Sequence, residues 1–148
     1  MMDKSPTFPL INSLNESVSP TIEQIVTFAS SGNFTNTLWH EFVQFLTFLL
    51  LAHNSTNNSD AKASVVRDFI RVCAQSGLKA LKSGKRIDYA KIAGSITTNS
   101  EKDTKMLVTL ANRLKDRLHT TAAESIMDEI NSRIFKGDLK QFLQRTMN

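Results

Sequence analysis

Three cations surround one glycine in the stretch LKSGKRID, which contains Lys82, Gly84, Lys85 and Arg86. Clustered lysine and arginine side chains bind the phosphate groups of nucleic acids. Cations also occur at the C-terminal ends of helices, where the negative end of the helix dipole stabilises them without any ligand. Two interpretations are therefore open: a helix end with solvated charges, or a site that holds an anion such as a nucleic-acid phosphate.

A second basic group follows in the sequence, where Lys115 stands between Arg113 and Arg117. Residues four apart are neighbours on one face of a helix, and like charges there destabilise it slightly unless an anion lies between them. If the basic residues do bind an anion, we expect the nucleic-acid-binding residues to be Lys82, Lys85, Arg86, Arg113 and Arg117.

The remaining residues do not form a recognisable catalytic motif. The three histidines, His40, His53 and His119, are scattered, and no metal-binding or phosphate-loop motif occurs. His40 and Glu41 are adjacent, so on a helix their side chains diverge by about 100° and do not easily chelate one ion. Cys73 falls on the apolar stripe of a predicted helix, which favours a core position over a nucleophile. We predict no catalytic residue, no metal site and no cofactor, and hence that the protein is not an enzyme.

The segment 36–52 is predicted to be a helix with apolar residues around nearly its whole circumference. Such a helix must be covered on every side, either at the centre of the fold or by another subunit. The aromatic residues have no cations interleaved with them, so a base-stacking platform is less favoured than packing. We therefore expect self-association or partner contacts from Trp39, Phe42, Phe45 and Leu49.

Helix caps and stops delimit the other elements. Residues 1–18, with two prolines and no period, predict an extended arm, and Ser19 with Pro20 predicts a helix start. Further starts are predicted at Ser59 or Asp60, at Asp88, at Ser100 with Asp103 and at Thr121 with Glu124, and stops at Gly32, Gly84 and Gly137.

Apolar residues recur with the helical period along the chain, and no segment of useful length alternates with the period of a strand. The predicted fold class is all-α: an antiparallel helical bundle of four main helices plus short ones, with an extended N-terminal arm. We expect residues 1–18 to be the arm and residues 19–148 to be one helical-bundle domain.

Composition limits the class of protein further. With 148 residues, 41% of them hydrophobic, the chain is long enough to bury a core without disulfides, and a lone cysteine suits a reducing compartment. The longest apolar run, 42–52, is too short to span a bilayer. We expect no membrane partner and no secretion, and a cytoplasmic or virion location. Residues 1–60 carry a net charge of −4 and residues 61–148 one of +8, so an acidic partner would bind the second part.

The order of these features resembles the coat proteins of rod-shaped plant viruses of the tobacco mosaic type. The segments that carry the resemblance are SPTFPLINSLNESVSP, TIEQIVTFASSGNF, TNTLWHEFVQF, SDAKASVVRDF, LKSGKRI and AAESIMDEINSRIFKG. The resemblance implies a four-helix subunit that stacks into helical arrays around RNA, with Lys82, Lys85 and Arg86 facing the RNA. Arg113 corresponds less closely to an arginine in a C-terminal helix of that family. The arginine with paired aspartates and the C-terminal tryptophan segment of that family are missing here.

We therefore predict a non-enzymatic structural protein, like a coat or nucleocapsid subunit, that forms homo-oligomers and binds the backbone of single-stranded RNA. The alternative is a small α-helical adaptor or regulatory module that does not bind nucleic acid. Such a module would bind a protein or peptide helix in a groove lined by Phe42, Phe45 and Leu49.

Overall fold

The computed structural model describes residues 9–57, 62–96 and 100–147, and the described residues are helical with short connections and no strand. The all-α fold class is therefore confirmed. The elements are α1 Pro9–Ser31, α2 Asn36–Asn54, the 3₁₀ helix η1 Ser55–Asn57, α3 Ala63–Lys82, α4 Tyr89–Gly94, α5 Glu101–Arg117, α6 Thr121–Phe135 and α7 Leu139–Met147.

The first helix begins earlier than the sequence suggested. The prediction of an extended arm is wrong for residues 9–18, because α1 begins at Pro9 and continues through Pro20. We read Pro20 as a helix start, since an interior proline removes one backbone hydrogen bond. The helix tolerates that loss, and Leu10, Leu14 and Val18 recur at a helical spacing. Residues 1–8 of the expected arm lie outside the described residues.

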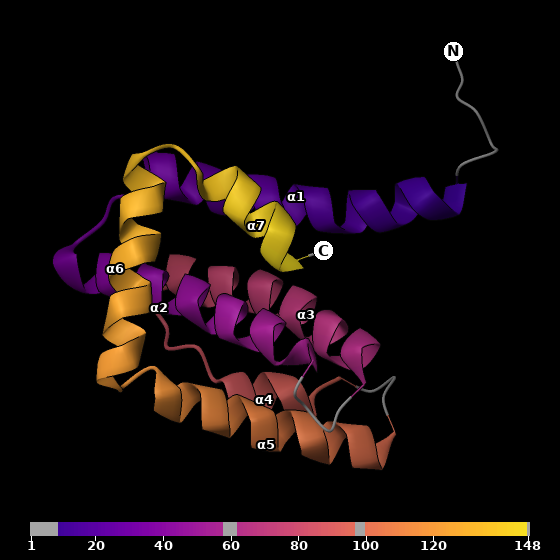
Figure 1. Ribbon diagram of the computed structural model, residues 1–148. Coiled ribbons are helices and arrows are strands. Elements are labelled where there is room, and N and C mark those ends of the chain that lie inside the picture. The colour runs from indigo at the N-terminus through magenta and orange to yellow at the C-terminus, as the bar shows by residue number, and fades with distance from the viewer. Residues whose placement is uncertain (1–8, 58–61, 97–99, 148) are drawn as a thin grey trace.

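The helices are arranged in three layers (Figure 1). The top layer holds α1 and α7, the middle layer α2 and α3, and the bottom layer α4 and α5, while α6 stands across one end of all three. The middle layer is thus covered from both sides. This arrangement brings the end of α5 close to the beginning of α2, two segments that are far apart in the sequence.

The central helix α2 holds the largest share of the core. Its second half is buried almost continuously, and Phe42, Phe45 and Phe48 are completely inaccessible to solvent. The one polar side chain buried there, Thr47, donates its hydroxyl to the backbone carbonyl of Val43 at 2.8 Å, so no hydrogen bond is lost. The rest of the chain therefore covers the second half of α2, as the first of the two alternatives requires.

Helix starts match the sequence in part. Ser100 caps α5 as predicted, and its hydroxyl accepts the Asp103 N–H at 3.1 Å. The start of α6 is one residue earlier than predicted: Thr120, not Thr121, is the cap, because Thr120 is still extended while Thr121 is already helical. The predicted cap of α3, Ser59 or Asp60, is also wrong. Lys62 takes the cap position and makes no side-chain hydrogen bond there. Residues 58–61 lie outside the described residues.

No helix in the part of the chain that the structure describes is both long and apolar enough to cross a membrane.

The close approach of α2 and α3 generates a stability prediction at Gly77. A Cβ atom added there would lie 2.5 Å from Cε1 of Phe45, and 3.2 Å from Cδ1 of Ile87. The Phe45 ring is fully buried and cannot move aside. We expect Gly77→Ala to lower the free energy of unfolding by about 1–3 kcal/mol in chemical denaturation, although alanine is the better helix former.

Gly94→Ala is the matched control, because its added Cβ meets only Val108 Cγ2, at 3.9 Å. This variant should be neutral, or more stable by up to about 1 kcal/mol. Equal effects of the two substitutions would contradict a tight contact between α2 and α3 at Gly77.

Candidate nucleic-acid interface

The basic stretch after α3 is built on a glycine turn. Gly84 has a φ of +68°, a left-handed conformation that costs glycine little. The Gly84 N–H donates to the Leu81 carbonyl at 3.2 Å, and the Lys85 N–H donates to the Ala80 carbonyl at 2.9 Å. These two bonds form a Schellman motif, which closes the helix end. The predicted stop is confirmed, and Lys85 and Arg86 lie beyond the helix with exposed side chains.

Next to this turn lies a cleft of about 660 Å³, which we call the basic cleft. Three segments form its walls: the first half of α2, the segment from the end of α3 to the start of α4, and the last turn of α5. The lining residues are Thr37, His40, Glu41, Gln44, Leu81, Gly84, Arg86, Ile87, Tyr89, Lys115, Leu118 and His119.

The structure separates the five basic residues that we grouped. Arg86 lines the basic cleft, and Lys82 and Lys85 are exposed in the adjoining turn. Arg113 and Arg117 are exposed but do not line the cleft, whereas Lys115 does. Lys115 is two residues from each arginine and therefore points roughly 160–200° away from them on α5. Arg113 and Arg117 thus belong to the opposite flank of the helix.

The basic residues of this region have no acidic partner among the described residues. The ion pairs that the structure shows involve other cations: Arg71, Lys105, Arg133, Lys140 and Arg145. Two of the walls contribute one cation each, Arg86 and Lys115, and the third contributes the carboxylate Glu41, so the lining carries a net positive charge.

Sequence reasoning missed most of the cleft. Thr37, His40, Glu41 and Gln44 recur at i, i+3, i+4 and i+7, so they form one polar strip on the otherwise apolar α2. That spacing was visible in the sequence and could have identified this wall. His40 and His119, which we treated as scattered, line the same cleft. Nevertheless, no group of three or more potential metal ligands occurs within the described residues.

Tyr89 connects the cleft to the core. Its ring stacks on Phe48 with 3.6 Å between the ring centroids and an angle of 8° between the planes. Burial raises the pKa of the Tyr89 hydroxyl well above its usual value, and repulsion between the phenolate and the nearby Glu41 carboxylate adds to this effect. Burial also raises the pKa of the Cys73 thiol, which suits our interpretation of Cys73 as a core residue.

The residues expected to contact a partner divide into two kinds. Phe42, Phe45 and Leu49 are completely buried within the chain, so the prediction of a surface groove lined by them is wrong. The physical reason is that the other helices of the same chain cover α2 on the sides where these residues lie. Trp39 is only half-buried, and its indole N–H donates to the Asn131 side-chain carbonyl of α6 at 2.7 Å.

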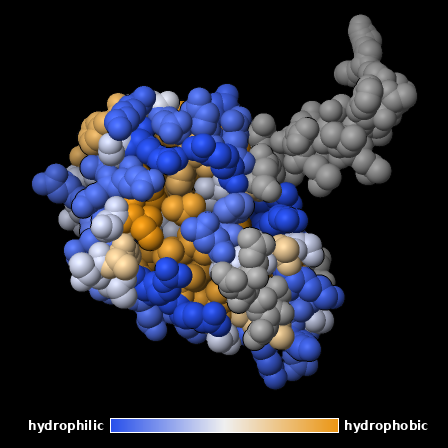
Figure 2. Space-filling view, viewed as in Figure 1, coloured by the Kyte–Doolittle hydropathy of each residue, from blue (hydrophilic) through white to orange (hydrophobic). Residues whose placement is uncertain are grey.

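Trp39 lines a second depression, an apolar groove of about 640 Å³ where the end of α1, the start of α2, the end of α6 and the start of α7 meet. We call it the Trp39 groove. Phe34 and Phe135 line it as well, and the Phe135 side chain is 78% exposed. Figure 2 shows a further gathering of hydrophobic residues over α2, framed by hydrophilic ones.

Comparisons with protein-family models, with curated proteins and with solved structures found no match for this chain. The resemblance to coat proteins of rod-shaped plant viruses therefore stays a prediction.

The environment of Tyr89 predicts a pH dependence of stability. Its pKa is raised in the folded state, so it stabilises the fold below the unfolded-state value of about 10, and this contribution is lost as the pH rises above that value. Tyr89 is the single tyrosine of the chain, so the ultraviolet absorbance of phenolate reports it alone. We expect phenolate to form only together with the loss of helical circular dichroism.

Tyr89→Phe should unfold at a higher pH than the unaltered chain, because this variant has no phenol to ionise. Phenolate formation near pH 10 with an unchanged helical signal would contradict a buried Tyr89.

Proposed function

We propose that the protein is a non-enzymatic structural protein that binds the phosphate backbone of single-stranded RNA along the basic cleft and the turn beside it. The observation that carries the proposal is the convergence of Arg86 and Lys115. They come from separate segments, line one cleft and have no acidic partner among the described residues. Lys82 and Lys85 extend this positive surface outward from the cleft.

Backbone contact is the mode that the side chains favour. Proteins that bind single strands by stacking present exposed aromatic rings beside their cations. The rings of Phe42, Phe45 and Phe48 are completely buried and cannot reach a base. Charge neutralisation by lysine and arginine is then the main source of affinity.

The salt dependence of RNA binding tests the proposal. The logarithm of the binding constant falls with the logarithm of salt concentration, with a slope of about −0.7 for each phosphate contact on a single strand. We expect Lys82→Ala combined with Lys85→Ala to weaken binding of a single-stranded RNA and to make this slope shallower by about 1.4. Fluorescence anisotropy over a series of salt concentrations measures both quantities.

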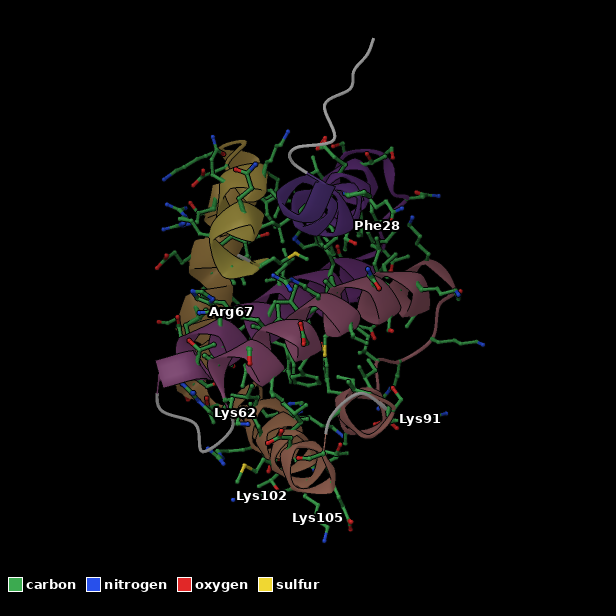
Figure 3. The ribbon with its side chains drawn as sticks, turned by 90° about the vertical axis from the view of Figure 1, so that its right-hand side faces the viewer. Phe28, Lys62, Arg67, Lys91, Lys102 and Lys105 are labelled. Atoms are coloured by element: carbon green, nitrogen blue, oxygen red, sulfur yellow. The ribbon has the colours of Figure 1, made fainter. Side chains whose placement is uncertain are left out.

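Lys102→Ala combined with Lys105→Ala is the matched control, since it removes the same charge from the other end of α5. Figure 3 shows both lysines on the first turns of that helix, directed outward. Lys105 pairs there only with the exposed Glu101, at 3.7 Å, so its removal has little effect on stability. Binding that does not respond to salt, or that falls equally in both double variants, would overturn the proposal.

The Trp39 groove supports the second part of the proposal, which is self-association of the subunit. Phe135 packs against Trp39 with 6.0 Å between the ring centroids, yet most of its surface faces solvent. Each copy presents both an exposed ring and a groove, so two copies can contact each other reciprocally. The alternative, an adaptor that holds a partner helix without RNA, would use the same groove.

Replacement of Phe135 tests self-association. We expect the unaltered chain to gain mass with rising protein concentration in sedimentation equilibrium. Phe135→Ala should shift this gain to concentrations at least about tenfold higher, because it removes an apolar ring from the interface. Its thermal unfolding should change little, since the ring is mostly exposed.

Phe135→Tyr keeps the ring and should associate as the unaltered chain does. A chain that stays monomeric at every concentration, and that binds no RNA, would favour the adaptor alternative.

A further inference from the structure

The basic cleft also contains groups that a phosphate strand alone would not use. Glu41 and Gln44 stand three residues apart on α2 and line the wall that completes the cleft with Arg86 and Lys115. Among the described residues, the Glu41 carboxylate forms no ion pair with either cation, although all three residues line the same space. Glu41 is a partly exposed residue of this wall, so its carboxylate is accessible to a ligand in the cleft.

A ligand for such a cleft must satisfy two opposite requirements. The two cations attract an anionic group, whereas a carboxylate repels phosphate and accepts hydrogen bonds from N–H or O–H donors. A bare phosphate meets only the first requirement. A nucleotide meets both, because its phosphate is anionic and its ribose and base carry donors.

The size and the apolar lining agree with this class of ligand. The volume of about 660 Å³ lies in the usual range of small-molecule sites. Ile87 is partly exposed and supplies apolar surface to the same cleft, against which the face of a base or sugar can pack, and the nearly buried Leu81 and Leu118 line it as well. His40 and His119 add ring nitrogens for further hydrogen bonds.

We infer that the basic cleft binds one nucleotide, with its phosphate between Arg86 and Lys115 and with donors of the ribose or base directed to Glu41 and Gln44. The nucleotide is either one unit of an RNA strand or a free nucleotide, and only the first source rests on the proposed function. In both cases the cleft is a pocket for a single unit, in addition to the phosphate contacts of Lys82 and Lys85.

Calorimetric titration of the full chain tests the inference, with the four ribonucleoside monophosphates, ribose 5-phosphate and inorganic phosphate as separate probes. We expect at least one monophosphate to bind about tenfold more tightly than inorganic phosphate, because the added donors reach a charged acceptor. Arg86→Ala should lower the affinity for that nucleotide by about tenfold or more, since a charged hydrogen bond to phosphate is lost.

Glu41→Gln is the second variant, and it keeps the size of the side chain while removing its charge. It should lower the affinity for the nucleotide and leave the affinity for inorganic phosphate equal or higher, so that the preference for the nucleotide shrinks. Circular dichroism of both variants shows whether they are folded. A merely structural role of Glu41 would change the affinity for both probes alike.

The outcomes separate this inference from the proposed function. Equal affinities for inorganic phosphate and all nucleotides, or a nucleotide affinity that Glu41→Gln does not change, would overturn the inference. Salt-dependent RNA binding without binding of any monophosphate would also overturn it, while the proposed function would stand. Binding of a monophosphate by a chain that does not bind RNA would support the inference with a free nucleotide and overturn the proposed function.

Discussion

The core is organised around the apolar second half of α2, which the other helices of the chain must cover. Its rings and aliphatic side chains point in nearly every direction, and leaving them in water would cost roughly 1.5–3 kcal/mol for each large residue. The chain meets this requirement by placing α3 beside α2, two further layers above and below, and α6 across the end. Gly77 permits the close approach of α3, because any larger side chain would overlap the Phe45 ring.

The basic cleft is a consequence of the one interruption in that apolar surface. The polar strip of α2 that contains Glu41 and Gln44 cannot be covered by core side chains without the loss of hydrogen bonds. The segments around it therefore leave a depression there, and they present polar and charged residues to it. The stack of Tyr89 on Phe48 anchors the start of α4 to the core, so the wall that carries Arg86 is held in place.

The positions of the helix ends determine where most of the cations beside the cleft lie. Both α3 and α5 end beside the cleft, and each carries lysine in its last turn, where the helix dipole stabilises a cation. Arg86 lies beyond the Schellman turn, two residues past Gly84, and the dipole does not account for its position. Its side chain lines a space that also contains a second cation, Lys115, and the carboxylate of Glu41.

Local features could be predicted from the sequence, because they depend on neighbours along the chain. Periodic apolar residues predicted the helices, and Ser100 was predicted to cap α5, as it does. Stops were predicted at Gly84 and Gly137, where the backbone turns with a positive φ. Long-range contacts decided the rest. Phe45 and Leu49 lie in the core and not at a subunit contact, since only the packed helices show which side of α2 is covered. Lys115 joins Arg86 while Arg113 and Arg117 do not, because the layer order determines which flank of α5 meets the cleft.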